Sequence, residues 1–209
     1  MPRFEELSSA LWPKLETLFG PRGACGGCWC MWWRVPHTGK MWAQAKGEPN
    51  HAAFRELVLS GRVRGVMAFD GDLPVGWCSF GPRADFPRVE MEGAYRRDDA
   101  RSAWCVNCFF ISPDYRGKDL SRSLLRAALD AMHKFGVAMV EAYPVVEALD
   151  GKPLPAALAW TGLLSIFLEQ GFTEIQRLSR DKPLVRLNLV EYRRKLISME
   201  EDRNKHVRK

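Results

Sequence analysis

The alternation of apolar and polar residues is most regular in the middle of the chain. An apolar run from Trp104 ends at Ser112-Pro113, and a short basic loop containing Gly117 follows it. Apolar residues then recur at helical spacing, at Leu120, Leu124, Leu125, Ala128, Leu129 and Met132. The pattern predicts a strand, a loop and a helix in direct succession.

Apolar patterns also predict the elements before this segment. A helix is expected where Phe4, Leu7, Leu11, Leu15 and Leu18 recur at helical spacing, with its end at Gly20-Pro21. The aromatic run 28–35 predicts the first strand. A helix is expected over 50–60, and the turn signal Asp70-Gly71 predicts a hairpin of strands 66–69 and 74–80. The segment 81–101 is expected to be a long loop.

Downstream, residues 138–143 read as a buried strand. A helix is expected over 161–170, capped by Thr161 and closed by Gly171. Strands over 174–178 and 184–189 complete the prediction.

Length and composition indicate one domain. The chain has 209 residues, of which 46% are hydrophobic, which is enough for one sizeable core. We expect a single domain over 1–209, with an N-terminal helical extension (1–27), a core (28–190) and a basic tail (191–209).

The formal net charge of +6 would suit an anionic ligand or nucleic acid. Much of the excess is in the tail, where seven Lys and Arg face four Asp and Glu, and we expect that tail to be a solvated helix or a frayed end. Because basic and aromatic residues do not interleave as in an RNA-binding motif, nucleic acid is not an expected partner. The N-terminus resembles neither a secretory signal nor a membrane span, so a cytoplasmic protein without membrane partners is expected.

Six cysteines, at Cys25, Cys28, Cys30, Cys78, Cys105 and Cys108, are expected to be reduced thiols in the cytosol. Their spacing allows a rival interpretation, since Cys25-Gly-Gly-Cys28 is typical of a zinc knuckle. Cys105 and Cys108 are less suited to a metal, because residues three apart in a strand point to opposite faces unless a bulge intervenes. We therefore expect no metal site.

The basic loop has the features of an anion site. It directs the unpaired N–H groups of the following helix's first turn to one point, and the helix dipole favours an anion there. Arg116 and Lys118 add positive charge.

This segment resembles the acetyl-CoA-binding motif of the GNAT superfamily of acetyltransferases. The matching residues are Phe109, Ile111, Pro113, Tyr115, Arg116, Gly117, Lys118, Asp119, Leu120 and Ser121. Asp119 and Ser121 depart from the family's pattern, because they stand where the two motif glycines are expected. A carboxylate there would repel pyrophosphate unless Asp119 caps the helix with its side chain turned aside. Downstream, 167–172 looks like the family's aromatic-x-x-x-Gly-Phe signature.

The resemblance implies an α/β (α+β) fold with a mixed, mostly antiparallel central sheet of about six to seven strands flanked by helices. It implies acetyl-CoA as cosubstrate and an amine of a small molecule or peptide as acceptor. The cofactor-binding positions would be Phe110, Ile111, Arg116, Gly117, Lys118, Asp119, Leu120 and Ser121. A homodimer is compatible with this reading.

Several residues are candidates for the proton-transfer group. Many relatives use a Tyr on the last helix as general acid, and the matching position is Phe167. Candidates to replace it are Tyr143 and Ser165, with Glu141 as base. Each also fits a structural role, and Trp29, Trp32, Trp33 and Trp42 fit either core packing or a wall of the acceptor pocket. The alternative function is a non-catalytic relative that binds acyl-CoA or senses metal or redox state.

Overall fold

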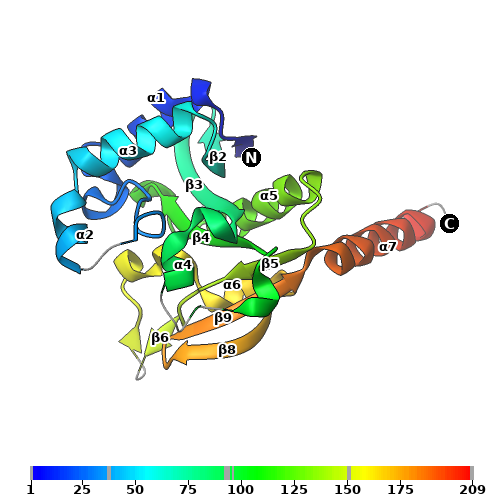
Figure 1. The fold of residues 1–209 in the computed structure, drawn as a ribbon. Helices are drawn as coiled ribbons and strands as arrows, with labels where there is room; N and C mark the ends of the chain where they lie inside the picture. The colour runs from blue at the N-terminus through cyan, green and yellow to red at the C-terminus, as the bar shows by residue number, and fades with distance from the viewer. Residues whose placement is uncertain (1, 37–38, 92–94, 96, 150–151, 208–209) are drawn as a thin grey trace.

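A seven-stranded sheet in the order β1-β2-β3-β4-β5-β9-β8 forms the centre of the protein (Figure 1). The computed structural model describes residues 2–36, 39–91, 95, 97–149 and 152–207. Neighbouring strands are antiparallel except β4 and β5, which are parallel. The mixed, mostly antiparallel sheet predicted from the sequence is confirmed. Its strands are β1 (Arg3–Glu6), β2 (Arg64–Asp70), β3 (Leu73–Pro82), β4 (Trp104–Ile111), β5 (Met139–Ala142), β8 (Thr173–Ser179) and β9 (Lys182–Asn188).

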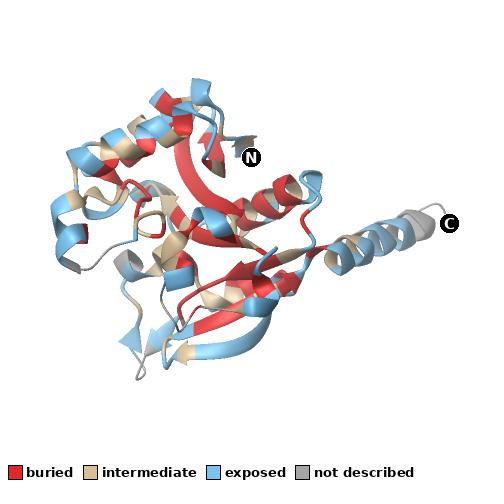
Figure 2. Ribbon diagram, viewed as in Figure 1, coloured by how far each residue is buried: buried red, intermediate tan, exposed pale blue. Residues whose placement is uncertain are grey.

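Helices cover both faces of this sheet. On one face lies α5 (Leu120–Lys134), and on the other lie α1 (Trp12–Phe19) and α3 (Glu48–Leu59). The strands β2, β3, β4, β5 and β9 are largely buried, whereas β8 and α7 are largely exposed (Figure 2). Burial on both faces explains why β4 reads as a continuous apolar run. The remaining elements are α2 (Gly39–Ala45), α4 (Pro87–Met91), α6 (Leu164–Glu169), α7 (Leu189–Val207) and the small hairpin of β6 (Ala148–Leu149) and β7 (Lys152–Pro153).

The central strand divides its side chains between the two cores. Phe109 and Ile111 pack with the α5 core, whereas Cys108 and Phe110 pack with the α1 and α3 core. On α5 the predicted helical positions are all buried, which confirms that helix. Predictions for the hairpin, for the helix over 50–60 and for the three later strands are also confirmed in position. Within the described part of the chain, no helix is both long and apolar enough to cross a membrane.

Two predictions for the N-terminal region, the first strand over 28–35 and the start of the first helix, are wrong. The first strand is β1, not 28–35, and it lies where a helix was expected. The helix α1 begins only at Trp12, with Pro13 in its first turn. Residues 28–35 form successive turns, because the chain reverses at Gly26 and Gly27, which have positive φ. The aromatic residues of this segment are buried by the winding of the chain, not by a pleat.

Two later boundaries also differ from the prediction. Thr161 closes a 3-10 turn over Ala156–Thr161, and α6 begins at Leu164, so Thr161 is not its cap. The expected loop 81–101 contains α4 and two short 3-10 turns; residues 92–94 and 96 of it lie outside the described residues.

A β-bulge changes the faces of β4. Ser79 pairs with Cys108 and Phe80 with Val106, so Asn107 is the extra residue. The bulge turns Cys105 and Cys108 to the same side, away from the α5 core, which corrects the expectation that they face opposite ways. They still have separate partners: the Cys105 sulfur lies 3.6 Å from the Tyr143 hydroxyl, and the Cys108 sulfur lies 3.6 Å from that of Cys30.

A buried ion-pair network joins the end of β3 to β5 and β9. Arg83 and Glu141 have 1% and 0% of their side chains exposed, and Arg83 Nη1 donates to Glu141 Oε2 at 2.7 Å. The other oxygen of Glu141 accepts from Arg186 Nη2 at 2.7 Å. Arg186 is the cross-strand partner of Glu141, so this buried carboxylate bridges the two guanidinium groups, while Glu90 and Asp99 add a second partner to Arg83 and Arg186.

We expect Glu141→Gln to lower the free energy of unfolding by about 3 kcal/mol, because the buried Arg83 loses its buried partner and keeps only the half-exposed Glu90. Urea denaturation measures this change. The matched control is Glu169→Gln, which removes an exposed partner of Arg122 and should cost less than about 1 kcal/mol. Equal losses in the two variants would contradict the structural role of Glu141.

Candidate active site

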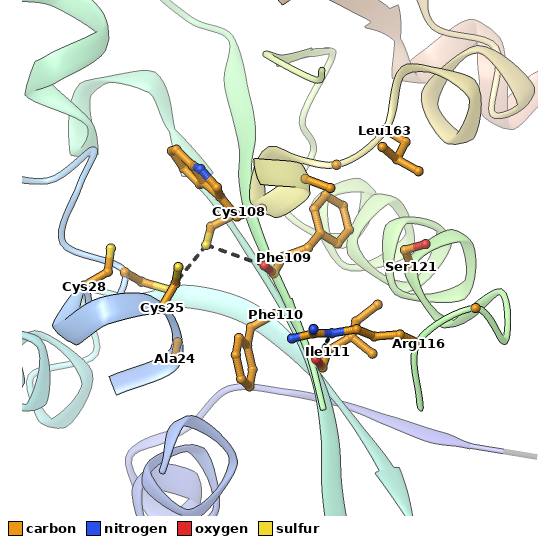
Figure 3. Close-up of a pocket in the computed structure, with 15 residues that line it drawn as sticks. Ala24, Cys25, Cys28, Cys108, Phe109, Phe110, Ile111, Arg116, Ser121 and Leu163 are labelled. Atoms are coloured by element: carbon orange, nitrogen blue, oxygen red, sulfur yellow. Dashed lines mark hydrogen bonds between the residues drawn. The ribbon is translucent and has the colours of Figure 1, made fainter. Parts of the chain in front are cut away.

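A cavity of about 300 Å³ opens beside β4 (Figure 3). Its walls come from four segments: residues 24–30, the end of β4, the loop before α5, and residues 159–163. Cysteine side chains from 25–30 and from β4 lie at one end, and Arg116 and Ser121 lie at the other. Five of the eight residues predicted to bind the cofactor line it, namely Phe110, Ile111, Arg116, Gly117 and Ser121.

The cavity exists because β4 and β5 separate. They pair only over Trp104–Val106, and beyond that point β5 leads to Val145, which bonds to Gly162 and Leu164 instead. Residues 159–163 therefore form the wall opposite β4. The open edge of β4 carries backbone groups that the sheet does not use.

The backbone N–H and C=O groups of successive strand residues point to alternate edges of the strand. This alternation identifies which β4 groups face the open edge. Ser112 N–H donates to Val75 O at 3.0 Å, so Phe110 also directs its backbone groups toward β3, and Phe109 and Ile111 direct theirs away from it. Arg116 Nε donates to the Ile111 carbonyl at 3.1 Å, which agrees with this direction. The N–H groups of Phe109 and Ile111 can therefore bind the amide and thioester carbonyls of an extended ligand.

The loop before α5 supplies the anion end. Gly117 has φ of +71° and lines the cavity, as does the Arg116 side chain. The first turn of the 15-residue helix α5 follows, with unpaired N–H groups. These features fit a pyrophosphate. The other loop positions point elsewhere: Leu120 is buried in the core, and the Lys118 ammonium lies 5.1 Å from the Tyr115 ring centre.

Asp119 does not cap α5 with its side chain. It has φ of +55°, in the left-handed region, and its carboxylate pairs with Arg122 at 3.1 Å. Arg122 also pairs with Glu169 at 2.7 Å. The capping expectation is therefore wrong, although the side chain is turned aside. The motif glycine is replaced by one of the residue types that tolerate this backbone conformation.

None of the three predicted catalytic residues is among the described residues that line the cavity. Glu141 is held in the ion-pair network, and the Tyr143 hydroxyl accepts from Arg83 Nη1 at 3.0 Å. Burial, followed by the Cys105 thiol, raises the pKa of Tyr143 well above its usual value. Ser165 uses its backbone N–H to bind Glu147 Oε1 at 2.6 Å. A catalytic acid or base must reach the substrate's proton, so these assignments stay predictions.

Phe167 lies behind the cavity wall. Its ring is fully buried and meets Phe109 edge to face, with centroids 6.1 Å apart. A side chain at Gly162 would clash with this ring, so the chain needs glycine there. At this position, the wall carries no hydroxyl.

Sequence reasoning did not place the thiols at the cavity. Cys25, Cys28, Cys30 and Cys108 line it, together with Trp160. The close spacing of the cysteines is a sequence signal for this thiol cluster, although the same spacing also suggests a zinc knuckle. Among the described residues, no group of three or more His, Cys, Asp or Glu side chains is arranged to hold a metal ion. The four predicted indoles pack elsewhere: Trp29, Trp33 and Trp42 are buried, and Trp32 meets Trp42 edge to face.

Solved structures with a similar fold are N-acetyltransferases. One from Staphylococcus aureus Mu50 has a TM-score of 0.52 at 12% identity, covering 90% of this chain and 99% of that chain. PaiA N-acetyltransferase from Thermoplasma acidophilum, in complex with coenzyme A, has a TM-score of 0.51 at 13% identity, with coverage of 90% and 99%. A ribosomal-protein-alanine N-acetyltransferase from Brucella melitensis has a TM-score of 0.51 at 16% identity, covering 89% and 99%.

At these identities the likeness establishes the fold. No curated protein matches the sequence. The family is established by a sequence model described as the acetyltransferase (GNAT) family, which matches residues 29–149, more than half of the chain. The chain therefore belongs to the GNAT acetyltransferase family, whose cosubstrate is acetyl-CoA.

Proposed function

We propose that this protein transfers the acetyl group of acetyl-CoA to an amine of a small molecule or peptide. The observation that carries the proposal is the continuous cavity that follows the open edge of β4 from the α5 loop to the cysteines. Three residues of strand, from Cys108 to Ile111, span roughly 10 Å. An extended arm bound at Arg116 and Gly117 would thus bring its thioester toward Cys108.

The protein's own groups would do the following work. The α5 loop binds the pyrophosphate through backbone N–H groups, with Arg116 adding positive charge. The N–H groups of Phe109 and Ile111 orient the arm and polarise the thioester carbonyl. Residues 159–163 exclude water from one side of the reacting carbon.

The acceptor end favours an uncharged amine. Phe110, Trp160 and Leu163 give the cavity apolar lining, and the described lining residues include no carboxylate that would hold an ammonium ion. A deprotonated amine is also the form that attacks a thioester. Peptide and small-molecule amines both satisfy this chemistry, and no observation favours the non-catalytic alternative.

A homodimer, a cytoplasmic location and the absence of nucleic-acid partners remain predictions of the sequence.

The activity test is acetyl-CoA turnover over panels of amines and peptides, followed by release of free CoA thiol. We expect release that depends on the amine and yields an acetylated product by mass spectrometry. Tight CoA binding with no amine-dependent release from any panel would instead support a binding module.

The cofactor loop is tested by Gly117→Val. A Cβ at Gly117 would meet no atom within 4 Å, so any effect comes from the backbone, which a β-branched residue cannot hold at φ of +71° without strain. Since left-handed strain costs about 1–2 kcal/mol, we expect CoA affinity to fall about tenfold. Calorimetry measures the affinity.

The control is Gly136→Val, which has the same φ and the same open space but follows the far end of α5. It should lose stability while keeping CoA affinity. Equal affinity in both variants would exclude the proposed loop.

The charge of Asp119 is tested by Asp119→Asn. Asn tolerates the left-handed backbone as well as Asp does, so the substitution removes only the charge. We expect CoA affinity to rise, and to rise more at low salt than at high salt, because the carboxylate repels the pyrophosphate. Lower affinity in calorimetry would mean that Asp119 assists binding, for example by orienting Arg122.

A further inference from the structure

Two cysteine side chains meet at the acceptor end of the cavity. Cys30, from the turn segment, and Cys108, on β4, both line it, and their sulfur atoms are 3.6 Å apart. This distance is within reach of a hydrogen bond between a thiol and a thiolate. Both sulfurs lie at the end of the cavity away from Arg116, where the thioester of a bound acetyl-CoA would reach.

The surroundings of the pair favour a negative charge on Cys30. Trp77 Nε1 donates a hydrogen bond to the Cys30 sulfur at 3.2 Å. The contact with Cys108 lowers the pKa of Cys30, and Trp77 and the Arg34 guanidinium add to this effect against burial, which raises it. The same contact, followed by burial, raises the pKa of Cys108 well above its usual value. These contacts favour Cys30 over Cys108 as the thiol that ionises.

The backbone around Cys30 is strained, and the fold maintains that strain. Trp29 and Cys30 have φ of +46° and +53°, which are unusual for residues other than glycine and cost on the order of 1–3 kcal/mol each. Two contacts fix the turn: Gly47 N–H and Asn50 Nδ2 both donate to the Gly27 carbonyl, at 3.0 and 3.1 Å. Backbone strain of this kind persists only where surrounding contacts hold the conformation in place. Here the strained conformation directs the Cys30 thiol into the cavity.

We propose that Cys30 is a nucleophile that takes the acetyl group from acetyl-CoA before the amine does, with Cys108 as the proton carrier. This inference rests on the proposed function and names a mechanism for the same site. Its observations are the thiol pair, the indole N–H donor and the position of both sulfurs on the cavity.

The first half of the reaction forms one thioester and breaks another. The Cys30 thiolate attacks the acetyl carbonyl, and the bond from that carbon to the CoA sulfur breaks. The departing CoA thiolate takes the Cys108 proton and leaves as free thiol. The enzyme then carries acetyl-Cys30 and a Cys108 thiolate.

The second half returns the enzyme to its first state. The amine nitrogen attacks the acetyl-Cys30 carbonyl, the bond to the Cys30 sulfur breaks, and the proton lost by nitrogen goes to the Cys108 thiolate. The products are the acetylated amine, the Cys30 thiolate and the Cys108 thiol. Cys108 acts as acid and then as base, so the cycle needs no hydroxyl at Phe167.

The test is incubation of the reduced protein with acetyl-CoA in the absence of any amine. We expect a burst of one CoA thiol per chain and a protein mass increased by one acetyl group, which neutral hydroxylamine removes. Peptide mapping should place the group on Cys30. Absence of both the burst and the mass increase in the active wild-type enzyme would overturn the proposal, whatever the variants do.

Three variants separate the roles of the thiols. Cys30→Ser should lose the hydroxylamine-sensitive acetyl group and at least about 10²-fold in turnover. Cys108→Ser should still form acetyl-Cys30, but with a burst slowed by about 10²-fold or more, since a serine hydroxyl is a poor proton carrier at neutral pH. The control is Cys78→Ala, a buried thiol that is not among the described cavity residues, and it should keep the burst. Full turnover in Cys30→Ser would contradict the role of Cys30.

Initial rates distinguish failure of this inference from failure of the proposed function. Parallel lines in double-reciprocal plots are expected for an acetyl-enzyme. Amine acetylation with intersecting lines and no acetyl-Cys30 would leave the proposed function standing and sink the covalent step. An acetyl-Cys30 that no amine can discharge would support the covalent step and contradict the proposed acceptor.

Discussion

The separation of β4 from β5 after Val106 is the constraint on which the rest of the site depends. A sheet normally uses every backbone group of an interior strand, and here three paired residues are followed by an open edge. That edge must be covered, and residues 24–30 and 159–163 approach it without pairing along it. The outcome is a cavity in which polar backbone groups are surrounded by apolar side chains, a combination suited to holding an amide-bearing chain.

The bulge at Asn107 adds to this effect. It lies at the point where the strands separate, and its carbonyl accepts a hydrogen bond from Trp33 Nε1 at 3.0 Å. The extra residue places Cys108 on the same side as the turn segment, where it meets Cys30. In a regular strand Cys108 would face α5, and the thiol pair could not form. A single inserted residue therefore decides what chemistry lies at the acceptor end.

Sequence pattern predicted the parts of the fold that have regular periods. The amphipathic spacing of α5, the Asp70-Gly71 turn and the apolar run of β4 each follow from local rules. The segment 28–35 did not, because Trp29, Trp33 and Met31 are buried by a chain of turns whose shape depends on contacts with Gly47 and Asn50. The cofactor loop was found through its motif, whereas the left-handed Asp119 is a backbone property that no periodicity records.

The free energy of acetyl transfer explains why two thiols are suited to the place where the CoA thioester would lie. Exchange of an acetyl group between two sulfur atoms conserves the type of bond, so the step has little driving force of its own, and the later formation of an amide supplies it. Such an exchange needs a thiolate of matched basicity rather than a strong base, and the Trp77 indole N–H, which donates to the Cys30 sulfur, favours one inside an apolar wall. A hydroxyl at Phe167 would add a buried polar group beside Gly162 and Phe109. In the proposed cycle Cys30 and Cys108 carry the proton, so that wall can remain apolar and exclude water from the acetyl group.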